Sequence, residues 1–322
     1  MKQSECESII ANVVARRVLN PDVIEIELDA YDGFLLPSYE AGAHIDVRIP
    51  GIGVRQYSLV RPHRAGEPYV VAVQVATDGR GGSRWIHQHL NVGATIEIGL
   101  PRNHFPLRSA ERTLLIAGGI GLTPLLCMAD TCEREGRAYS LVVCSRREEN
   151  IVYFEELLAP RIHGQVQFVL DGGDPSRGLD VVALLRAQLV GTQIYCCGPA
   201  GLMAAVRGVG EELEGLSLHF EAFGATPLPA SDASQTSFTV SCAQSGITVE
   251  IAPDDTILDS LLAEGLDVDH SCREGYCGTC LTRWLSGAPI HRDTCLGDVE
   301  RSRYVAVCTA RAEAGSVLVL DI

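Results

Sequence analysis

The 322-residue sequence lacks three features that would each point to a class of protein. Positive charge is scarce, because 26 Lys and Arg stand against 41 Asp and Glu and give a net charge of −15 at pH 7. Binding to a nucleic-acid backbone depends on clustered cations, so this balance argues against a nucleic-acid partner. The longest apolar stretch, residues 113–129, is interrupted by three glycines and Pro124, and is too broken to span a bilayer. Repeats and low-complexity segments are also absent, so we expect ordinary globular domains.

A secretory signal is a further absence. No apolar leader follows Met1, where the chain reads MKQSECESII. The twelve cysteines show no disulfide framework, and Cys144, Cys196 and Cys197 lie inside apolar runs. Disulfides persist mainly in oxidising compartments. We therefore expect reduced thiols in a cytoplasmic protein.

What the sequence does contain is a cysteine loop at residues 272–280, which reads CREGYCGTC. The spacing C-x4-C-x2-C is typical of the plant-type [2Fe–2S] ferredoxin site, with a fourth thiol further along. Gly275 and Gly278 allow the tight backbone turns that such a loop needs. Zinc is the alternative, because the pair Cys277 and Cys280 alone would suit it. Structural zinc sites usually have a second short-spaced pair, which this sequence lacks, so the pattern favours a [2Fe–2S] cluster.

Two later cysteines compete to be the fourth ligand. Cys295 lies in a polar stretch with the composition of a loop, whereas Cys308 ends the apolar run Tyr304–Cys308, which we predict as a buried strand. A cluster ligand must be held rigidly and away from solvent. This favours the set Cys272, Cys277, Cys280 and Cys308.

The hydrophobic pattern predicts a multidomain protein. Residues 1–108 contain short alternating segments between turn signals, as in a small antiparallel β-barrel. Residues 109–225 alternate apolar strands with helices, which predicts an α/β domain with a parallel sheet. The expected strands are 113–117, 139–144, 166–170 and 193–197, and the expected helices are 152–158, 179–189 and 201–213. Residues 226–235 read as a linker, and residues 236–322 as strands with a helix at 257–263 and the cysteine loop.

Two motifs in the barrel suit a flavin phosphate. The segment RQYS carries Arg55, whose guanidinium offers a bidentate fork to phosphate, with Tyr57 and Ser58 to face a flavin ring. The segment GRGGS at 79–83 precedes an expected helix at 84–90, whose N-terminal amides attract anions. A surface arginine, a core tyrosine and a plain helix cap at Ser83 are the structural alternatives. The two motifs together favour a flavin site.

The α/β domain carries a glycine-rich turn, AGGIGLTP at 117–124, between a strand and a helix. Its glycines let the backbone approach a pyrophosphate, and we expect Thr123 to cap the helix. The segment Cys197-Gly198-Pro199 ends another strand at the same sheet edge, so its thiol either faces a nicotinamide or is a small buried residue. Phe223, at the end of the domain, packs either on a cofactor ring or on the core.

These motifs occur in a characteristic order: RQYS, GRGGS, PRNHF at 101–105, AGGIGLTP, CCGP, HFEAFGA and the cysteine loop. In this order the chain resembles the phthalate dioxygenase reductase group, which also contains vanillate demethylase reductases. The resemblance implies an FMN-binding β-barrel, an NAD-binding α/β domain and a C-terminal [2Fe–2S] ferredoxin with an α+β β-grasp fold. It also supports Cys308 as the last cluster ligand.

The resemblance assigns site residues. The FMN site would contain Arg55, Gln56, Tyr57, Ser58, Gly81, Gly82, Ser83 and Phe223. The NAD site would contain Gly119, Gly121, Thr123, Ser145, Arg146, Asp171, Cys197, Gly198 and Pro199. Asp171 is a candidate for the adenosine ribose, whereas Arg146 and Arg147 would also suit a 2′-phosphate, so NADPH stays an alternative to NADH.

Together the three sites predict an electron route. A nicotinamide delivers two electrons as hydride, a [2Fe–2S] cluster accepts one, and a flavin does both. We expect a monomeric NADH-dependent oxidoreductase that passes electrons to a Rieske-type oxygenase acting on an aromatic substrate such as phthalate, with no residue acting as general acid or base. The alternatives are an electron-relay subunit of a permanent complex, as in some dihydroorotate dehydrogenases, and a zinc-binding interaction protein.

The last 87 residues are acidic. Between Thr236 and Ile322, thirteen acids stand against six arginines. Seven of the acids are clustered: Glu250, Asp254, Asp255, Asp259, Glu264, Asp267 and Asp269. They form either a docking surface for a basic partner or an ordinary solvated face.

Overall fold

The computed structural model describes residues 8–76, 81–223, 236–270, 273, 275, 278–293 and 295–322. The chain divides into two compact units, Met1–Glu221 and Ala222–Ile322. In the described part of the chain, no helix is long and apolar enough to cross a membrane.

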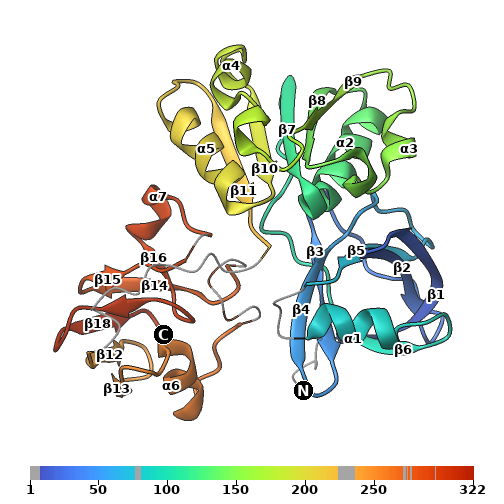
Figure 1. The fold of residues 1–322 in the computed structure, drawn as a ribbon. Coiled ribbons are helices and arrows are strands. Elements are labelled where there is room, and N and C mark those ends of the chain that lie inside the picture. The colour runs from blue at the N-terminus through green and yellow to red at the C-terminus, as the bar shows by residue number, and fades with distance from the viewer. Residues whose placement is uncertain are drawn as a thin grey trace. The chain divides into compact units, whose positions relative to one another are not determined.

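The first unit begins with a six-stranded antiparallel sheet in the order β4-β3-β6-β1-β2-β5 (Figure 1). Its strands are β1 (Ser8–Asn20), β2 (Val23–Ala30), β3 (His44–Ile49), β4 (Gly53–Ser58), β5 (Tyr69–Gln74) and β6 (Thr95–Gly99). An antiparallel bridge between Leu59, just after β4, and Val71 in β5 joins the two outer strands and closes a barrel. Inside lie fully buried side chains such as Ile45, Tyr69 and Ile98, while helix α1 (Gly82–His89) contributes Ile86. The predicted antiparallel barrel is confirmed.

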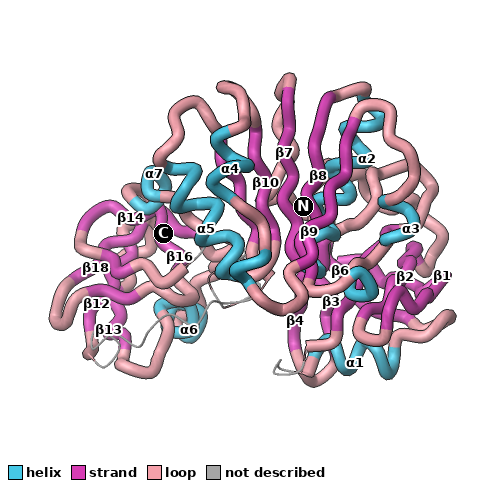
Figure 2. The backbone as a smooth tube through the Cα atoms, turned by 45° about the horizontal axis from the view of Figure 1, so that its top comes forward, coloured by secondary structure: helices cyan, strands magenta, loops and turns pink. Residues whose placement is uncertain are grey.

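A second sheet of five parallel strands follows, in the order β11-β10-β7-β8-β9. Figure 2 shows β10, β7 and β8 side by side in this sheet. The strands are β7 (Arg112–Gly118), β8 (Ala138–Ser145), β9 (Gly164–Leu170), β10 (Gln193–Cys197) and β11 (Ser217–Glu221). The helices of this part are α2 (Leu122–Glu135), α3 (Phe154–Leu157), α4 (Val181–Arg186) and α5 (Ala200–Glu211). The predicted parallel α/β fold is confirmed.

Alternate residues of the central strands serve two cores. Leu115 and Cys197 pack with α2 and with barrel residues such as Phe105, whereas Leu114 packs with α4 and α5 through residues such as Val206. Strands buried on both faces read as unbroken apolar runs, which is why they were visible in the sequence.

The helices are shorter than predicted. The helix expected at 152–158 starts only at Phe154, because Tyr153 adopts a left-handed conformation with φ 59°. The helix expected at 179–189 starts after Asp180, whose carboxylate accepts from the Ala183 amide and fixes the cap. Local capping geometry, which apolar periodicity does not report, sets these ends.

The second unit is α+β. Its sheet has the order β13-β12-β18-β14-β16, with β12 and β18 parallel. The elements are β12 (Phe238–Cys242), β13 (Thr248–Ile251), α6 (Ile257–Ala263), β14 (Leu281–Ser286), β15 (Pro289–Ile290), α7 (Asp298–Arg301), β16 (Tyr304–Ala306), β17 (Arg311–Ala312) and β18 (Val317–Leu320). The predicted helix at 257–263 is present, begins after a Thr256 cap, and buries Ile257, Leu258 and Leu261 in the unit's core.

One strand prediction in this unit is wrong. The run Tyr304–Cys308 was expected to be a strand throughout, but β16 ends at Ala306. Cys308 lies in the turn that follows, where the Thr309 amide donates to the Ala306 carbonyl at 3.1 Å. The thiol is nevertheless only 2% exposed, because the turn packs into the core of the unit.

Candidate functional site

The two barrel motifs meet at Arg55 and Gly82. A side-chain carbon on Gly82 would lie 2.9 Å from Cγ of Arg55, so only glycine allows this approach. Helix α1 begins at Gly82 after Gly81, whose φ of 84° favours glycine, and it has no side-chain cap and no acidic residue in its first turn. Uncapped amides beside a guanidinium suit a phosphate group.

Ser83 lies inside α1 and is not its N-cap. Its hydroxyl instead accepts from the Ala76 amide at 2.9 Å, which ties the helix to the residues just after β5. Gly79 and Arg80 of the same motif lie outside the described residues.

Gln56 and Tyr57 have different surroundings. The amide nitrogen of Gln56 lies 3.1 Å from Nε2 of His44, and burial lowers the pKa of His44 to about 3, so this ring is neutral and accepts the amide proton. Tyr57 packs against the barrel core, and burial raises the pKa of its phenol. A neutral aromatic ring at this edge is what a flat cofactor ring would require.

Ser58 reaches a residue that the sequence did not single out. Its hydroxyl donates to Oε2 of Glu221 at 3.4 Å, across 163 positions of the chain. Burial raises the pKa of the Glu221 carboxyl to about 8, and the bond from Ser58 offsets this only in part. Glu221 therefore retains its proton at neutral pH. Its place in the HFEAFGA motif was the only signal that marked it.

Cys197 lies next to this pair, because it is the register partner of Glu221 where β10 and β11 run side by side. The thiol is fully buried, and burial, reinforced by Glu221 and Cys196, raises its pKa well above the usual value. It is therefore a neutral group and not a nucleophilic thiolate.

The glycine-rich turn lies where the sheet order reverses, between β7 and β10. A side-chain carbon on Gly121 would lie 2.3 Å from the Cys197 carbonyl oxygen, and one on Gly198 would lie 2.9 Å from Cα of Gly118. Pro199 packs onto Gly118 in the same way. Gly119, in contrast, has open space beside it and a φ of 56°. Such a switch point is where open α/β sheets bind nucleotides.

Thr123 does not cap α2, contrary to expectation. It lies inside the helix, 2% exposed, and its hydroxyl donates to the Ile120 carbonyl at 3.0 Å. The N-cap is Gly121, and the first turn has no side-chain cap and no acidic residue. Pro124 has no N–H and the Leu122 amide donates to the Gly119 and Ile120 carbonyls, so the glycine turn itself is what offers a pyrophosphate a close approach to the backbone.

The ends of β8 and β9 bring the expected adenosine residues together. The Asp171 amide donates to the Ser145 carbonyl at 3.1 Å, and the Gly172 amide donates to the Arg146 carbonyl at 2.9 Å. Oδ1 of Asp171 already accepts from the Gly173 amide at 2.7 Å, which fixes the carboxylate. Arg147 instead pairs with Glu149 at 3.6 Å.

The remaining predicted residues lie in the second unit. Phe223 is 45% exposed, and its role stays a prediction. Cys272 and Cys277 lie outside the described residues, while Cys280 and Cys308 are 3% and 2% exposed. The Val307 amide donates to the Cys280 carbonyl at 3.4 Å, so the backbones that carry these two cysteines are joined.

The cysteine loop fits a cluster-binding turn. Gly275 has a φ of 75°, and a side-chain carbon there would lie 2.7 Å from the Thr309 hydroxyl oxygen. Gly278 also has a positive φ of 74°. Cys295 is half-buried, and its thiol donates to the Asp293 carboxylate at 3.8 Å. Buried thiols at the closely packed end of the loop are the environment that a [2Fe–2S] cluster needs.

Comparison with known proteins agrees with this arrangement. Residues 240–313 match the family described as "2Fe-2S iron-sulfur cluster binding domain". The chain is 39% identical to the vanillate O-demethylase oxidoreductase of Pseudomonas sp. (strain HR199 / DSM 7063), over 96% of this chain and 98% of that protein. It is 38% identical to the tert-butanol monooxygenase / tert-amyl alcohol desaturase reductase subunit of Aquincola tertiaricarbonis, over 90% of this chain and 89% of that protein.

Among solved structures, that of phthalate dioxygenase reductase is described as a modular structure for electron transfer from pyridine nucleotides to [2Fe–2S]. It matches with a TM-score of 0.71 and 36% identity, over 98% of each chain. This chain therefore belongs to the phthalate dioxygenase reductase family of oxidoreductases, and residues 240–313 form its 2Fe-2S domain.

Proposed function

We propose that this protein takes hydride from NADH onto FMN, then passes single electrons through a [2Fe–2S] cluster to a Rieske-type oxygenase. The observation that carries the proposal is the contact between Ser58 and Glu221 at 3.4 Å. It brings the edge of the barrel that suits a flavin phosphate to the edge of the parallel sheet that suits a pyrophosphate. A two-electron donor and a flavin would meet there.

The barrel residues hold and orient the flavin in this proposal. Arg55 and the first-turn amides of α1 bind the phosphate, and Gly82 leaves room for the guanidinium beside the helix. Tyr57 offers a neutral ring to the flat face of the cofactor. FMN, when bound, supplies the conversion from two-electron to one-electron transfer.

The parallel sheet binds the nicotinamide nucleotide. The glycine turn before α2 receives the pyrophosphate, and the open side of Gly119 admits it. Neutral Cys197 and protonated Glu221 place no negative charge where hydride must arrive. Ser145 and Asp171 receive the adenosine ribose, which favours NADH.

Glu221 also holds a proton at its carboxyl next to the Ser58 hydroxyl. This pair was not foreseen from the sequence, which predicted no general acid or base. In the proposed function the pair keeps the site neutral and hydrogen-bonded.

The proposal also covers the partner protein and the substrate on which that partner acts. Two of the relatives are named as a tert-butanol monooxygenase reductase subunit and a phthalate dioxygenase reductase, so an oxygenase partner is common to these two names. We propose an aromatic substrate such as phthalate, a monomeric reductase and a cytoplasmic location. The described cysteines form no disulfide, which fits a reducing compartment. An electron-relay subunit of a permanent complex is the alternative.

The proposal is tested on the purified protein. Acid-released flavin should co-elute with FMN on a column, and anaerobic NADH should bleach the flavin absorbance faster than equal NADPH. Recovery of FAD, or no bleaching by NADH, would overturn it. If the chain transfers electrons only when it is purified as part of a larger complex, the alternative of an electron-relay subunit is favoured.

A matched pair of variants locates the phosphate site. Arg55→Ala should be purified with little flavin, because the fork to the phosphate is lost. Arg48→Ala, on β3 and 61% exposed beside Glu97, should retain it. Equal flavin content in the two variants would show that Arg55 does not bind the flavin phosphate.

A further inference from the structure

A network of three arginines and three carboxylates lies away from the residues assigned to cofactors. Its members, called here the Arg61 network, are Arg17, Glu25, Arg61, Asp130, Glu156 and Arg161. Arg17 and Glu25 come from the barrel strands β1 and β2, and Arg61 follows β4. Asp130 and Glu156 come from α2 and α3. The network therefore joins the barrel to the helices of the nucleotide-binding sheet within one compact unit.

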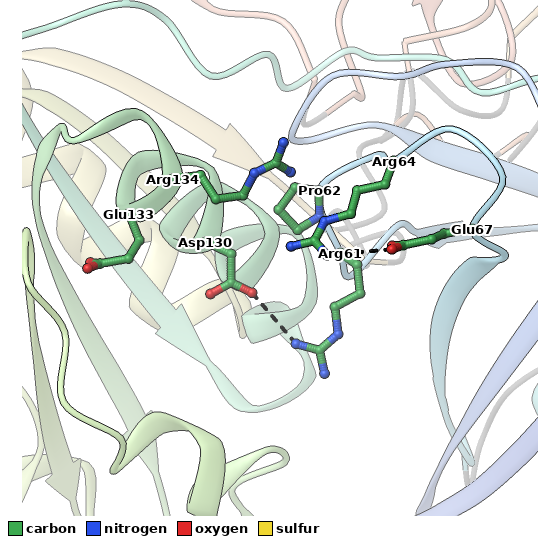
Figure 3. Close-up of a pocket in the computed structure, with 7 residues that line it drawn as sticks. All are labelled: Arg61, Pro62, Arg64, Glu67, Asp130, Glu133 and Arg134. Carbon is green, nitrogen blue, oxygen red and sulfur yellow. Dashed lines mark hydrogen bonds and ion pairs between the residues drawn. The ribbon is translucent and has the colours of Figure 1, made fainter.

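Arg61 is its centre. The guanidinium forms a fork with Glu156, in which Nη2 donates to Oε2 at 2.9 Å and Nη1 donates to Oε1. Nη1 also lies 3.6 Å from Oδ2 of Asp130, the ion pair drawn in Figure 3. The planar group lies over the Tyr153 ring at 4.9 Å. A fork of fixed geometry sets orientation as well as distance.

Arg17 and Arg161 each hydrogen-bond a carboxylate that also faces Arg61. Oε1 of Glu25 accepts from Nε of Arg17 at 3.0 Å, and its other oxygen lies 3.8 Å from Arg61. Oδ1 of Asp130 accepts from Nη1 of Arg161 at 2.7 Å. The side chains of Glu25 and Arg161 are only 7% and 10% exposed. Charges this poorly hydrated are held in place, since each would be costly to leave without its partner.

Tyr153 shows the same constraint in the backbone. It holds a left-handed conformation, with φ 59°, that few residues other than glycine adopt. Its ring is 7% exposed and lies beneath Arg61, with Arg17 at 5.9 Å. The start of α3 is therefore fixed by the network and not by local preference.

Arg61 is tied to both ligand edges by short, rigid paths. Only Leu59 and Val60, both fully buried, separate it from Ser58. Asp130 lies two turns along α2 from the helix start at Leu122, where the pyrophosphate would bind. We propose that Arg61 is a positioning residue for hydride transfer, which fixes the flavin edge of β4 against the nucleotide edge of α2. This inference rests on the proposed function.

The hollow in Figure 3 supplies a matched control. It has a volume of about 380 Å³ and is lined by both Arg61 and Arg64. Arg64 is 62% exposed and pairs with the neighbouring Glu67 at 3.5 Å. Arg61→Gln and Arg64→Gln thus remove the same charge from one hollow, but only the first breaks the fork to α3.

The experiment measures flavin reduction in the full-length, cofactor-loaded protein by stopped flow. With saturating NADH, the flavin of Arg61→Gln should be reduced at least tenfold more slowly than that of wild type. A misplacement of the reacting groups by about 1 Å can lower a rate by up to about a hundredfold. Reduction by dithionite, which needs no nicotinamide alignment, should be unchanged. Arg64→Gln should match wild type in both reactions.

Two results would overturn the inference. Arg61→Gln could melt at a lower temperature yet be reduced by NADH within twofold of wild type, which would leave only a stabilising role. Dithionite reduction could slow equally, which would indicate damage to the flavin site. If Arg61→Gln does not fold, Arg61→Lys, which keeps the charge but not the fork, replaces it with the same criteria. Failure of wild type itself to react with NADH would refute the proposed function instead.

Discussion

At the scale of single residues, Glu221 departs from the ordinary behaviour of a carboxyl group. A carboxyl with a pKa of about 8 keeps its proton over a range in which an unfolded chain releases it. Its contribution to stability is complete below the ordinary glutamate pKa and is lost as pH rises through about 8. The sequence did not predict this, because the carboxyl meets Ser58, which lies 163 positions away in the chain.

This predicts a pH effect that a neutral substitute removes. Between pH 5 and pH 8 (roughly the interval between the two pKa values), the wild type should lose about 2–4 kcal/mol more unfolding free energy than Glu221→Gln. Urea denaturation of flavin-loaded protein at both pH values measures the difference. Parallel loss in the two proteins would show that Glu221 is ionised at neutral pH.

The fourth cluster ligand is also a question about one residue. Cys308→Ser should abolish the visible absorption and the reduced-state EPR signal of the cluster, because the buried thiolate is lost. Flavin content and NADH oxidation with ferricyanide should persist. Cys295→Ser, whose thiol meets Asp293, should keep the cluster. The reverse outcome would assign Cys295 to the iron.

At the scale of elements, the strands were easier to predict than the helix ends. β7 and β10 are buried on both faces, so their composition alone marks them. The ends of α2, α3 and α4 depend on backbone conformations at Gly121, Tyr153 and Asp180. For the same reason the cap expected at Thr123 was wrong, since Gly121 is the N-cap of α2. The nucleotide-binding role of the glycine motifs stays a prediction.

The close approach of α2 to β10 yields a test of this packing. Gly121→Ala places a carbon 2.3 Å from the Cys197 carbonyl oxygen, so the helix or the strand must move. We expect a loss of about 2 kcal/mol or more of unfolding free energy and weaker NADH binding. Calorimetry and nucleotide titration measure the two effects.

Gly208→Ala is the control for that variant. Gly208 lies within α5, and a side-chain carbon there meets nothing within 4 Å. Because alanine favours a helix over glycine, it should stabilise the protein by about 0.5–1 kcal/mol. If the unfolding free energy changed equally in both variants, the close contact at Gly121 would not contribute to stability.

At the scale of the whole molecule, the acidic surface of the second unit is a candidate docking site for the partner protein. The seven clustered acids of the second unit are all exposed, and Asp259 pairs with Arg273 at 3.0 Å. Composition identified this acidic surface. Its role in docking depends on the complementary charge of the partner protein.

Salt separates the two roles. If the acids steer a basic patch on the oxygenase, electron transfer to it should slow several-fold between low salt and 1 M, where the Debye length is about 3 Å. Reduction of ferricyanide by the same protein serves as the reference reaction. An unchanged rate with the oxygenase would leave the acids as a solvated face.

The strand order of the second unit also bears on how the protein is made. β18 lies in the centre of that sheet, between β12 and β14, although it is the last of its strands along the chain. During synthesis, β12 and β14 therefore emerge from the ribosome well before the strand that joins them. We expect iron and sulfide to be inserted only after residues 317–320 have been translated, onto a chain whose first unit has already folded.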